Sequence, residues 1–415
     1  MRVEMGNKQI FTTDDMKVKS LSKQLNEPEW LLNNRLEAFK RLNQLQAPII
    51  ERVDYYDWDL WKLPSILEKK SEGNISKIIN EDLQDKNILI SNFEQATVTN
   101  EDLFSKLYHE AAFTRFENLF QAFTMAYLTD SLFIYIPENT QAIQPLELTF
   151  ELNNLTQKQT NRQVLIYAGA NSAIEIIERY TSMDNEEKAS ANIAVQILAD
   201  TGANIQYTSF DQFSENTTAF VQREATTKKD ATVNFAIGVM SEGDVIEDIQ
   251  VHLEGQGSSS DVKTVVLSYQ NQIQAVNASV TNIGSHTIGN IFQHGVALDA
   301  STVAFNGIGH ILKDSKHSDA QQESRVLMLS DEARADANPI LLIDEYEVQA
   351  GHAASVSRVD QDQLYYLMSR GLARTEAEKL IIGGFLGIVL SEISVKEVRE
   401  EFIETIDRKL ANYES

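Results

Sequence analysis

The chain has 415 residues, of which 61 are Asp or Glu and 36 are Lys or Arg, so its formal net charge at pH 7 is −25. Such an acidic chain repels phosphate backbones and anionic headgroups, which argues against nucleic acids and membrane surfaces as partners. It contains no cysteine, so disulfides, thiolate metal ligands and thiol nucleophiles are excluded within this chain.

No stretch of the sequence supplies the roughly 20 consecutive apolar residues that a membrane span needs. The first residues, MRVEMGNKQIFTTDD, lack the apolar core of a secretory signal. We therefore expect a soluble, cytoplasmic protein. If the protein takes part in metal chemistry, its own ligands are histidines or carboxylates, or the ligands come from a partner.

Residues 1–130 are predicted to form a mainly helical N-terminal region. In NEPEWLLNNRLEAFKRLNQL, Pro28 suits a first helical turn, and Leu32, Leu36 and Phe39 follow at helical spacing. A second run, LFSKLYHEAAFTRFENLFQAFTMAYLTD, is predicted to be helical over 103–130.

Residues 131–355 have the composition of a β-rich core. Twelve of the eighteen glycines fall there, and no proline occurs between Pro145 and Pro339. A long stretch without proline suits strands whose N–H groups are mostly paired. Short apolar runs such as VLIYAG, IAVQILA and TVVLSYQ alternate with turn-forming residues. Only AGANSAIEI (168–176) and TGANIQYTS (201–209) resemble each other closely, which is too little to define a repeat.

Two architectures fit this β-rich region. It is too long for a small sandwich and lacks the helical segments of a βαβ sheet, which leaves a large barrel or sandwich, or a parallel β-helix. Exposed ends of stacked coils need covering, and the flanking helical regions are suited to that role. We favour the parallel β-helix.

Residues 356–415 are predicted to form a C-terminal helical region. Asp360 followed by Gln363, and Thr375 followed by Glu378, each combine an N-cap with a glutamine or glutamate three residues later. The predicted helices cover 361–370, 376–391 and 395–412, and Gly371 ends the first of them.

Motifs for small-molecule chemistry are absent from the sequence. It contains no phosphate-binding loop, no nucleophile elbow and no paired zinc histidines on a helix. Carboxylates at Asp344, Glu345 and Glu347 could suggest a carbohydrate-active β-helix enzyme. Such enzymes are usually exported, however, and this chain lacks an export signal, so a solvated strand edge is the simpler interpretation.

Five histidines of the second half are candidate metal ligands. Four of them lie within 32 residues and could align on stacked strands, although zinc and iron sites usually have closer local pairs. Surface or buried structural histidines are the default interpretation for these four, which are His286, His294, His310 and His317.

His352, the fifth histidine, lies between a predicted strand and a predicted helix, on the same strand face as Val348 and Ala350. Its neighbours Gly351 and Ala353 are small and would leave it accessible from outside. From these residues alone, a structural role is the commoner outcome for such a histidine.

Several segments resemble the SufB/SufD family of iron–sulfur cluster assembly proteins. The most specific is SDAQQESRVLMLSDEARADANPILLIDEYEVQAGHAASVSRVDQDQLYYLMSRGLARTEAEKLIIGGFL (318–386). NGIGHI (306–311), PEWLLNNRLEAF (28–39) and AYLTDSLFIYIP (126–137) agree with it. The chain is more similar to SufD-type than to SufB-type members, which carry scaffold cysteines and His-Glu-Ala where this chain has Gly351-His352-Ala353. Some SufD-type members have a cysteine where this chain has Ala350.

The resemblance implies a right-handed parallel β-helix and a complex with SufB and two copies of the ATPase SufC. It implies that late β-helix strands pair with SufB and that a nascent cluster forms at that interface, with His352 as the candidate iron ligand. The C-terminal helices would dock SufC, and we assign that contact to Tyr365, Tyr366, Leu367 and Arg370 as a hypothesis.

No catalytic residue and no stably bound cofactor are expected; a transient Fe–S cluster at the SufB interface is the implied cargo. The function implied is therefore that of a non-enzymatic scaffold subunit. The alternatives are a carbohydrate-active β-helix enzyme and a homodimeric adaptor that never contacts iron. The sequence leaves open whether the chain forms a homodimer when alone, whether a flavin is involved and how many coils the β-helix has.

Overall fold

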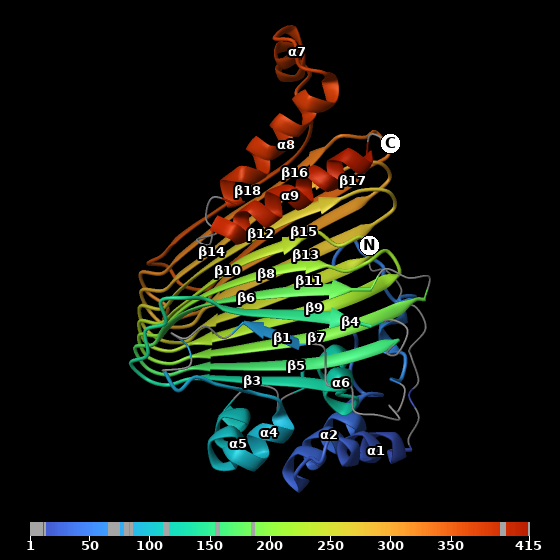
Figure 1. Cartoon of the computed structure of the whole chain (residues 1–415). Helices are drawn as coiled ribbons and strands as arrows, with labels where there is room; N and C mark the ends of the chain where they lie inside the picture. Colours follow the sequence, from blue (N-terminus) through green and yellow to red (C-terminus); the bar gives the residue numbers. More distant parts are fainter. Residues whose placement is uncertain are drawn as a thin grey trace.

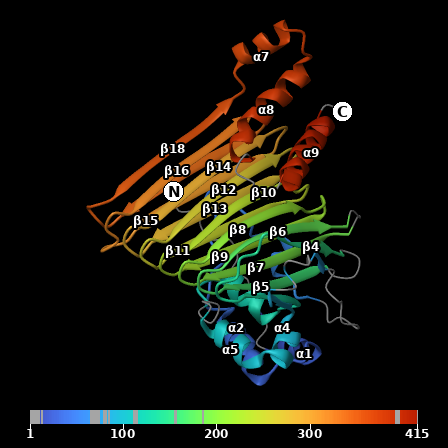
Figure 2. The same ribbon diagram turned by 60° about the vertical axis from the view of Figure 1, so that its left-hand side comes forward.

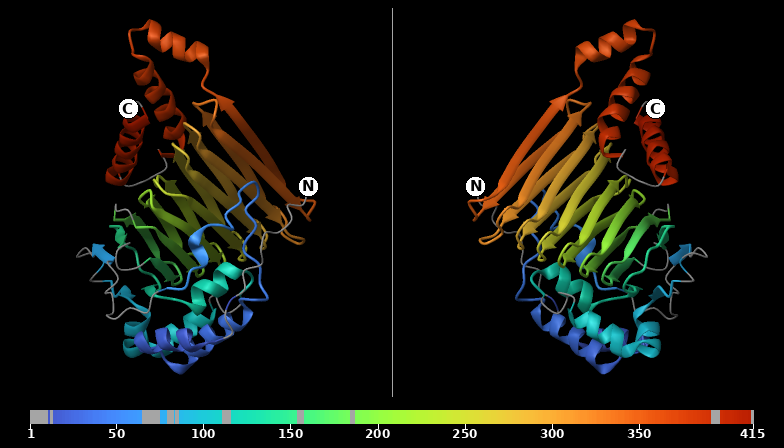
Figure 3. Two further views of the ribbon diagram at one scale, coloured as in Figure 1. Left: turned by 90° about the vertical axis from the view of Figure 1, so that its right-hand side faces the viewer. Right: turned by 90° about the vertical axis from the view of Figure 1, so that its left-hand side faces the viewer.

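In the computed structural model the chain forms a parallel β-solenoid with helices at both ends (Figure 1). The N-terminal helices lie at one end of the solenoid and the last two strands at the other (Figure 3). The structure describes residues 11, 14–64, 75–78, 83, 86–110, 116–153, 158–183, 187–390 and 396–413.

The N-terminal region is mainly helical, as predicted. Pro28 is the N-cap of α2 with φ −67° and an extended ψ, which fits the restricted backbone of proline. The run 103–130 is not one helix, because α5 ends at Glu110 and α6 begins at Leu119. The elements are α1 (Met16–Gln24), α2 (Glu29–Arg41), η1 (Asp59–Trp61), β1 (Ile75–Ile78), β2 (Leu89–Ser91), α4 (Phe93–Thr99), α5 (Glu101–Glu110) and α6 (Leu119–Ala126).

The solenoid is built from two nine-stranded sheets, each coil contributing one strand to each. Sheet A has the order β1-β4-β6-β8-β10-β12-β14-β16-β18, and sheet B the order β17-β15-β13-β11-β9-β7-β5-β3-β2. The strands are β3 (Asp130–Ile136), β4 (Leu146–Leu152), β5 (Gln159–Ala168), β6 (Ala173–Ser182), β7 (Ala189–Ala199), β8 (Asn204–Gln212), β9 (Thr217–Thr227), β10 (Thr232–Val239), β11 (Val245–Leu253), β12 (Ser259–Ser268), β13 (Ile273–Asn282), β14 (Ile288–Ala297), β15 (Thr302–Ile311), β16 (Asp319–Met328), β17 (Arg334–Ile343) and β18 (Gln349–Arg358).

Parallel pairing in register decides between the two architectures left open by the sequence. Ile273 of β13 lies opposite Thr302 of β15, one coil later, and the other coils repeat this arrangement. The two antiparallel pairs, β1 with β4 and β2 with β3, close the N-terminal end of the sheets. The fold is therefore a parallel β-helix and not a barrel or a sandwich.

One turn of each coil repeats a left-handed backbone conformation. Its N–H donates to a carbonyl of the next coil, as Asn171 does to Thr201 at 2.9 Å. Asn, Asp and Gly tolerate positive φ best among the residues, and they occupy most of these positions. The residues with positive φ in this turn are Asn139, Asn171, Gly202, Asp230, Gly257, His286 and His317.

The core lies between the two sheets and consists of columns of side chains in register. One column runs through Ile176, Tyr207, Phe235, Val262 and Ile291, all buried. Such columns are the expected product of parallel strands, whose alternate side chains share a face. The same interior contains a buried ionic network, in which Arg223 bonds Glu247 and Asp211 while Glu178 accepts hydrogen bonds from Tyr180 and Tyr207.

The C-terminal helices are α7 (Gln361–Ser369), α8 (Arg374–Leu390) and α9 (Lys396–Tyr413). Asp360 caps α7 as predicted, accepting from the N–H of Asp362 at 2.8 Å. Helix α8 begins two residues before the predicted start at 376, because Glu376 accepts from the N–H of Ala373. The predicted end at 391 and start at 395 lie outside the described residues.

Helix α9 and the second half of α8 cover the outer face of sheet A, whereas α7 and the first half of α8 project away from it (Figures 1 and 2). Leu386, Leu390, Phe402 and Ile406 are buried in this contact. Within the described residues no helix is both long and apolar enough to cross a bilayer.

Candidate functional site

The solenoid is open at its C-terminal end, where β17 and β18 are the last strands of their sheets. Among the described residues each pairs within its sheet with one neighbour, β15 or β16. Side chains that continue the interior columns are exposed here, including Ile343 at 45% and Val356 at 40%. Free strand edges with exposed apolar side chains are the usual template for pairing with another chain.

His352 lies inside β18, which continues to Arg358, beyond the expected limit of the β-core at 355. The strand–helix joint predicted beside His352 is therefore further along the chain. Its partner in register is Gln322 of β16, a buried inward-facing residue, so His352 belongs to the interior face of the last coil. Its residue is nevertheless exposed, and its imidazole makes no hydrogen bond or ion pair with any described residue. The open end thus presents one imidazole to whatever covers it.

Gln322 makes the interior polar directly below His352. Its Nε2 donates to the Ile340 carbonyl at 3.0 Å, whereas its buried Oε1 has no partner among the described residues. Gly309 leaves room for this amide, because a Cβ there would lie 2.5 Å from Nε2. Sequence reasoning missed Gln322, because nothing in the pattern of β16 indicates that this polar residue faces inward.

The four clustered histidines are not brought together. Only the rings of His286 and His317, in the left-handed turns, lie close together, with centroids 4.9 Å apart and planes tilted by 51°. His294 lies buried on the outer face of sheet A, and His310 pairs with Asp344 on sheet B at 3.1 Å. In the described part of the chain no three His, Asp or Glu side chains are arranged to hold a metal ion.

The three carboxylates considered for a carbohydrate-active enzyme lie at or beside the turn before β18. Asp344 pairs with His310, and Glu347 lies 3.4 Å from Lys316. Hydrogen bonds from the backbone N–H groups of Tyr346 and Asp314 lower the pKa of Glu345. Each carboxylate is thus occupied by a structural contact, which matches the solvated-edge interpretation.

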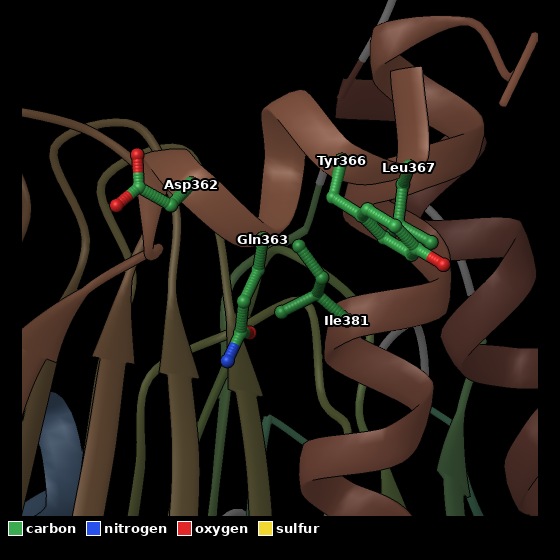
Figure 4. A pocket seen from close by; sticks show the side chains of 5 residues that line it. All are labelled: Asp362, Gln363, Tyr366, Leu367 and Ile381. Atoms are coloured by element: carbon green, nitrogen blue, oxygen red, sulfur yellow. The ribbon is translucent and has the colours of Figure 1, made fainter. Parts of the chain in front are cut away.

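The residues predicted to dock an ATPase lie on the projecting helices. Tyr365 and Tyr366 are 74% and 56% exposed. Arg370 lies over the Tyr366 ring, 5.1 Å from its centroid. Tyr366 and Leu367 border an open hollow of about 470 Å³ between α7 and α8 (Figure 4). The sequence prediction missed the other lining residues, Asp362, Gln363 and Ile381.

The sequence matches the family model described as SUF system FeS cluster assembly, SufBD core domain, over residues 150–385. It is 32% identical to the iron–sulfur cluster assembly protein SufD of Bacillus subtilis (strain 168), covering 96% of this chain and 98% of that protein.

The chain belongs to the SufB/SufD family. It is also 23% identical to an iron–sulfur cluster assembly SufBD family protein of Staphylococcus saprophyticus and 24% identical to one of Staphylococcus aureus (strain MRSA252). Each comparison covers 94% of this chain and 90% of the relative. The open end with β17 and β18, and the whole of α7, lie inside the part that matches the SufBD core, whereas α9 lies outside it.

Proposed function

We propose that this SufB/SufD family member is a non-enzymatic scaffold subunit of a cytoplasmic SUF complex. It pairs with SufB through β17 and β18, binds the ATPase SufC through α7 and α8, and offers His352 to a nascent Fe–S cluster at the SufB interface. The observation that carries the proposal is the open end of the solenoid, where free strand edges, exposed core side chains and His352 coincide.

A second solenoid end is the natural cover for this surface. A partner strand added to β17 or β18 would satisfy the free backbone groups and continue the ladder. Its inward side chains would cover Ile343 and Val356, which are exposed interior positions. Burial of such apolar surface contributes about 25 cal/mol per Å². A partner with the same fold meets both requirements.

His352 is the one iron ligand that we propose this chain contributes at the open end. An imidazole is a competent iron ligand, and thiolates are the usual cluster ligands. Because this chain has no cysteine, any thiolate ligand must come from another molecule, and we propose SufB. The cluster is cargo that is assembled and passed on, so its ligand set is completed only in the complex.

The projecting helices provide a separate binding surface for the ATPase. Tyr365, Tyr366 and Leu367 combine exposed aromatic rings with an apolar hollow, and aromatic residues are enriched among interface hot spots. This surface lies on α7 and the first half of α8, which project from the solenoid, so SufC and SufB can bind the same chain together (Figure 2).

The proposal is tested by coexpression with SufB and SufC and purification without oxygen. Iron content and cluster absorbance are compared between wild type, His352→Ala and the control His310→Ala, which removes a partly exposed histidine of sheet B. We expect loss of cluster only in His352→Ala, with the complex intact. Normal cluster content in that variant would contradict the role of His352 and leave a purely architectural subunit.

The proposed SufC site on the projecting helices is tested by retention of SufC on the immobilised chain. Tyr366→Ala and Leu367→Asp are expected to lose SufC while SufB is retained. Val98→Asp is the control, because Val98 is 81% exposed on α4 at the other end of the molecule. Unchanged SufC retention in both Tyr366→Ala and Leu367→Asp would refute this docking site.

A further inference from the structure

His294 of β14 bridges two elements that are far apart in the sequence. Its Nδ1 lies 3.1 Å from the carbonyl oxygen of Phe385 in α8, and its Nε2 lies 3.0 Å from Oε1 of Glu323 in β16. The imidazole also stacks on the Phe385 ring, with centroids 5.0 Å apart and planes 22° apart. With 1% of its surface exposed, His294 is buried in this contact.

Both hydrogen bonds of the bridge require the histidine to donate. The Phe385 carbonyl can only accept a hydrogen bond. An ionised Glu323 carboxylate can likewise only accept one. Arg325 on the same strand donates to the other Glu323 oxygen at 2.8 Å. The bridge is therefore complete when both ring nitrogens carry hydrogens, and a charge-assisted pair of this kind is stronger than a neutral hydrogen bond.

The bridge holds α8 at the point where the helix leaves the solenoid. Residues 361–381, here called the arm, project from the body, whereas Leu386 and Leu390 are buried against sheet A. The helix is weak at this point because Gly383, Gly384 and Gly387 fall in its interior. A Cβ at any of them would meet nothing within 4 Å, so packing does not require glycine there. Each glycine costs about 1 kcal/mol of helix stability relative to alanine.

The other end of the bridge lies next to the candidate iron ligand. Glu323 pairs in register with Ala353, the residue that follows His352 in β18. Two residues further along β16, Arg325 pairs with Ser355. The contacts Phe385–His294–Glu323 thus form one hydrogen-bonded path from the solenoid-bound part of α8 to β16, the strand that pairs with β18.

We infer that His294 is a positioning residue: together with Glu323 it fixes the angle of the arm on the solenoid, and the arm pivots at Gly383–Gly387 when this contact is lost. Under the function proposed above, the same contact passes motion of an arm-bound ATPase to the edge that holds His352. The geometric part of the inference concerns this chain alone and does not depend on that function.

The angle of the arm is measured by electron spin resonance distances in the isolated protein. The chain has no cysteine, so Ser369→Cys on α7 and Gln256→Cys on an exposed solenoid turn give two unique label sites. The otherwise unmodified chain is expected to give one narrow distance distribution. His294→Phe keeps the aromatic stack and removes both hydrogen bonds, and we expect that it broadens and shifts the distribution.

Two further variants make the result decisive. His310→Phe removes an exposed histidine–carboxylate pair of similar length from sheet B and should leave the distribution unchanged. Adding Gly383→Ala and Gly384→Ala to His294→Phe should narrow the distribution again, because alanine stiffens the pivot. If His294→Phe matches the unmodified chain while its melting temperature is preserved, the positioning role is wrong. If the two alanines fail to narrow the broadened distance distribution, the arm does not pivot at Gly383–Gly387, and that claim is wrong.

The functional part is tested in the reconstituted complex. His294→Phe should retain SufC in a pull-down but lose the ATP-dependent change in reactivity of a probe at the open edge. A wild-type complex without any ATP-dependent change would count against the proposed function, whereas an equal change in wild type and His294→Phe would count only against the coupling.

Discussion

The ring of Phe402 in α9 lies directly on the backbone of Gly238 in β10, and a Cβ at position 238 would overlap it. The same ring stacks on Phe210 of β8 at 4.2 Å between centroids. Glycine is therefore needed here for the close approach of a helix to the sheet. This contact is one of the points that hold the C-terminal helices on sheet A.

Replacing Gly238 with alanine is expected to push α9 off the sheet. Overpacking of a filled contact typically costs about 1–3 kcal/mol, so α9 should become protease-sensitive before the solenoid unfolds. Limited proteolysis and thermal unfolding measure the two effects. Gly384→Ala is the matched control, since open space surrounds Gly384 and alanine should leave or slightly increase stability. Equal protease resistance of α9 in Gly238→Ala and wild type would disprove the contact.

A buried lysine makes the docking of α9 depend on pH. Burial lowers the pKa of Lys409 to about 7, from an ordinary value of 10.5. Its ammonium donates to the carbonyls of Ser241, at 2.6 Å, and Leu267, at 3.3 Å, and lies over the Tyr269 ring. Between these two pKa values the unfolded chain binds the proton more tightly than the folded chain. Stability should therefore fall as the pH is lowered from about 10 to about 7, and then level off.

Lys409→Met isolates this effect, because it removes the titrating group and leaves the helix face apolar. The free energy of unfolding in urea, wild type minus variant, should rise between pH 7 and pH 9 by up to about 1.4 kcal/mol per unit. The two unsatisfied carbonyls in the variant add a cost that does not depend on pH. A difference that stays constant over this range would mean that Lys409 remains charged when α9 is docked.

The interior network predicts a strong asymmetry between two substitutions. Arg223 and Glu247 have fully buried side chains, and Arg223 forms ion pairs with Glu247 and Asp211 and exerts a favourable electrostatic influence on Glu178. Arg223→Met leaves those carboxyl groups without a counter-charge, which typically costs about 3–5 kcal/mol. Burial raises the pKa of Glu247 well above its ordinary value, so Glu247→Gln resembles the protonated acid and should cost much less. Chemical unfolding measures the free energy of unfolding of both variants. A larger loss of stability in Glu247→Gln than in Arg223→Met would contradict the predicted asymmetry.

Much of the fold could be predicted from the sequence because β-solenoids leave local traces. The proline-free stretch ends at Pro339, which falls in β17, the last strand of sheet B, where an unpaired edge tolerates proline. The similarity between the two Gly-Ala-Asn segments, by contrast, did not predict the length of one coil. The similarity aligns Asn171 with Asn204, whereas the strand register places Ala173 opposite Asn204. Coil length varies with the loops, so only the pairing reveals it.

The site was less predictable for a physical reason. His352 could be singled out from its small neighbours and from family resemblance. Gln322 and His294 could not, because their roles depend on which residues lie one coil away or on a helix much later in the chain. A polar residue in a strand pattern gives no sign of whether it faces the interior, as Gln322 does, or a docked helix, as His294 does.

Val356 offers the sharpest test of the open end. It shares a face of β18 with His352 and continues the buried column of Val266, Gly295 and Val326. A lysine at this position would be buried without a counter-charge when a second solenoid end stacks on it.

Val356→Lys should therefore weaken the proposed pairing with SufB at least about tenfold, a loss of roughly 1.4 kcal/mol or more. Any self-association of the isolated chain through the same end should weaken in parallel, measured by sedimentation. Ile143→Lys is the control, because Ile143 is 85% exposed in the loop before β4. If Val356→Lys still pairs with wild-type affinity, the open end of the solenoid is not the interface, and partners bind elsewhere.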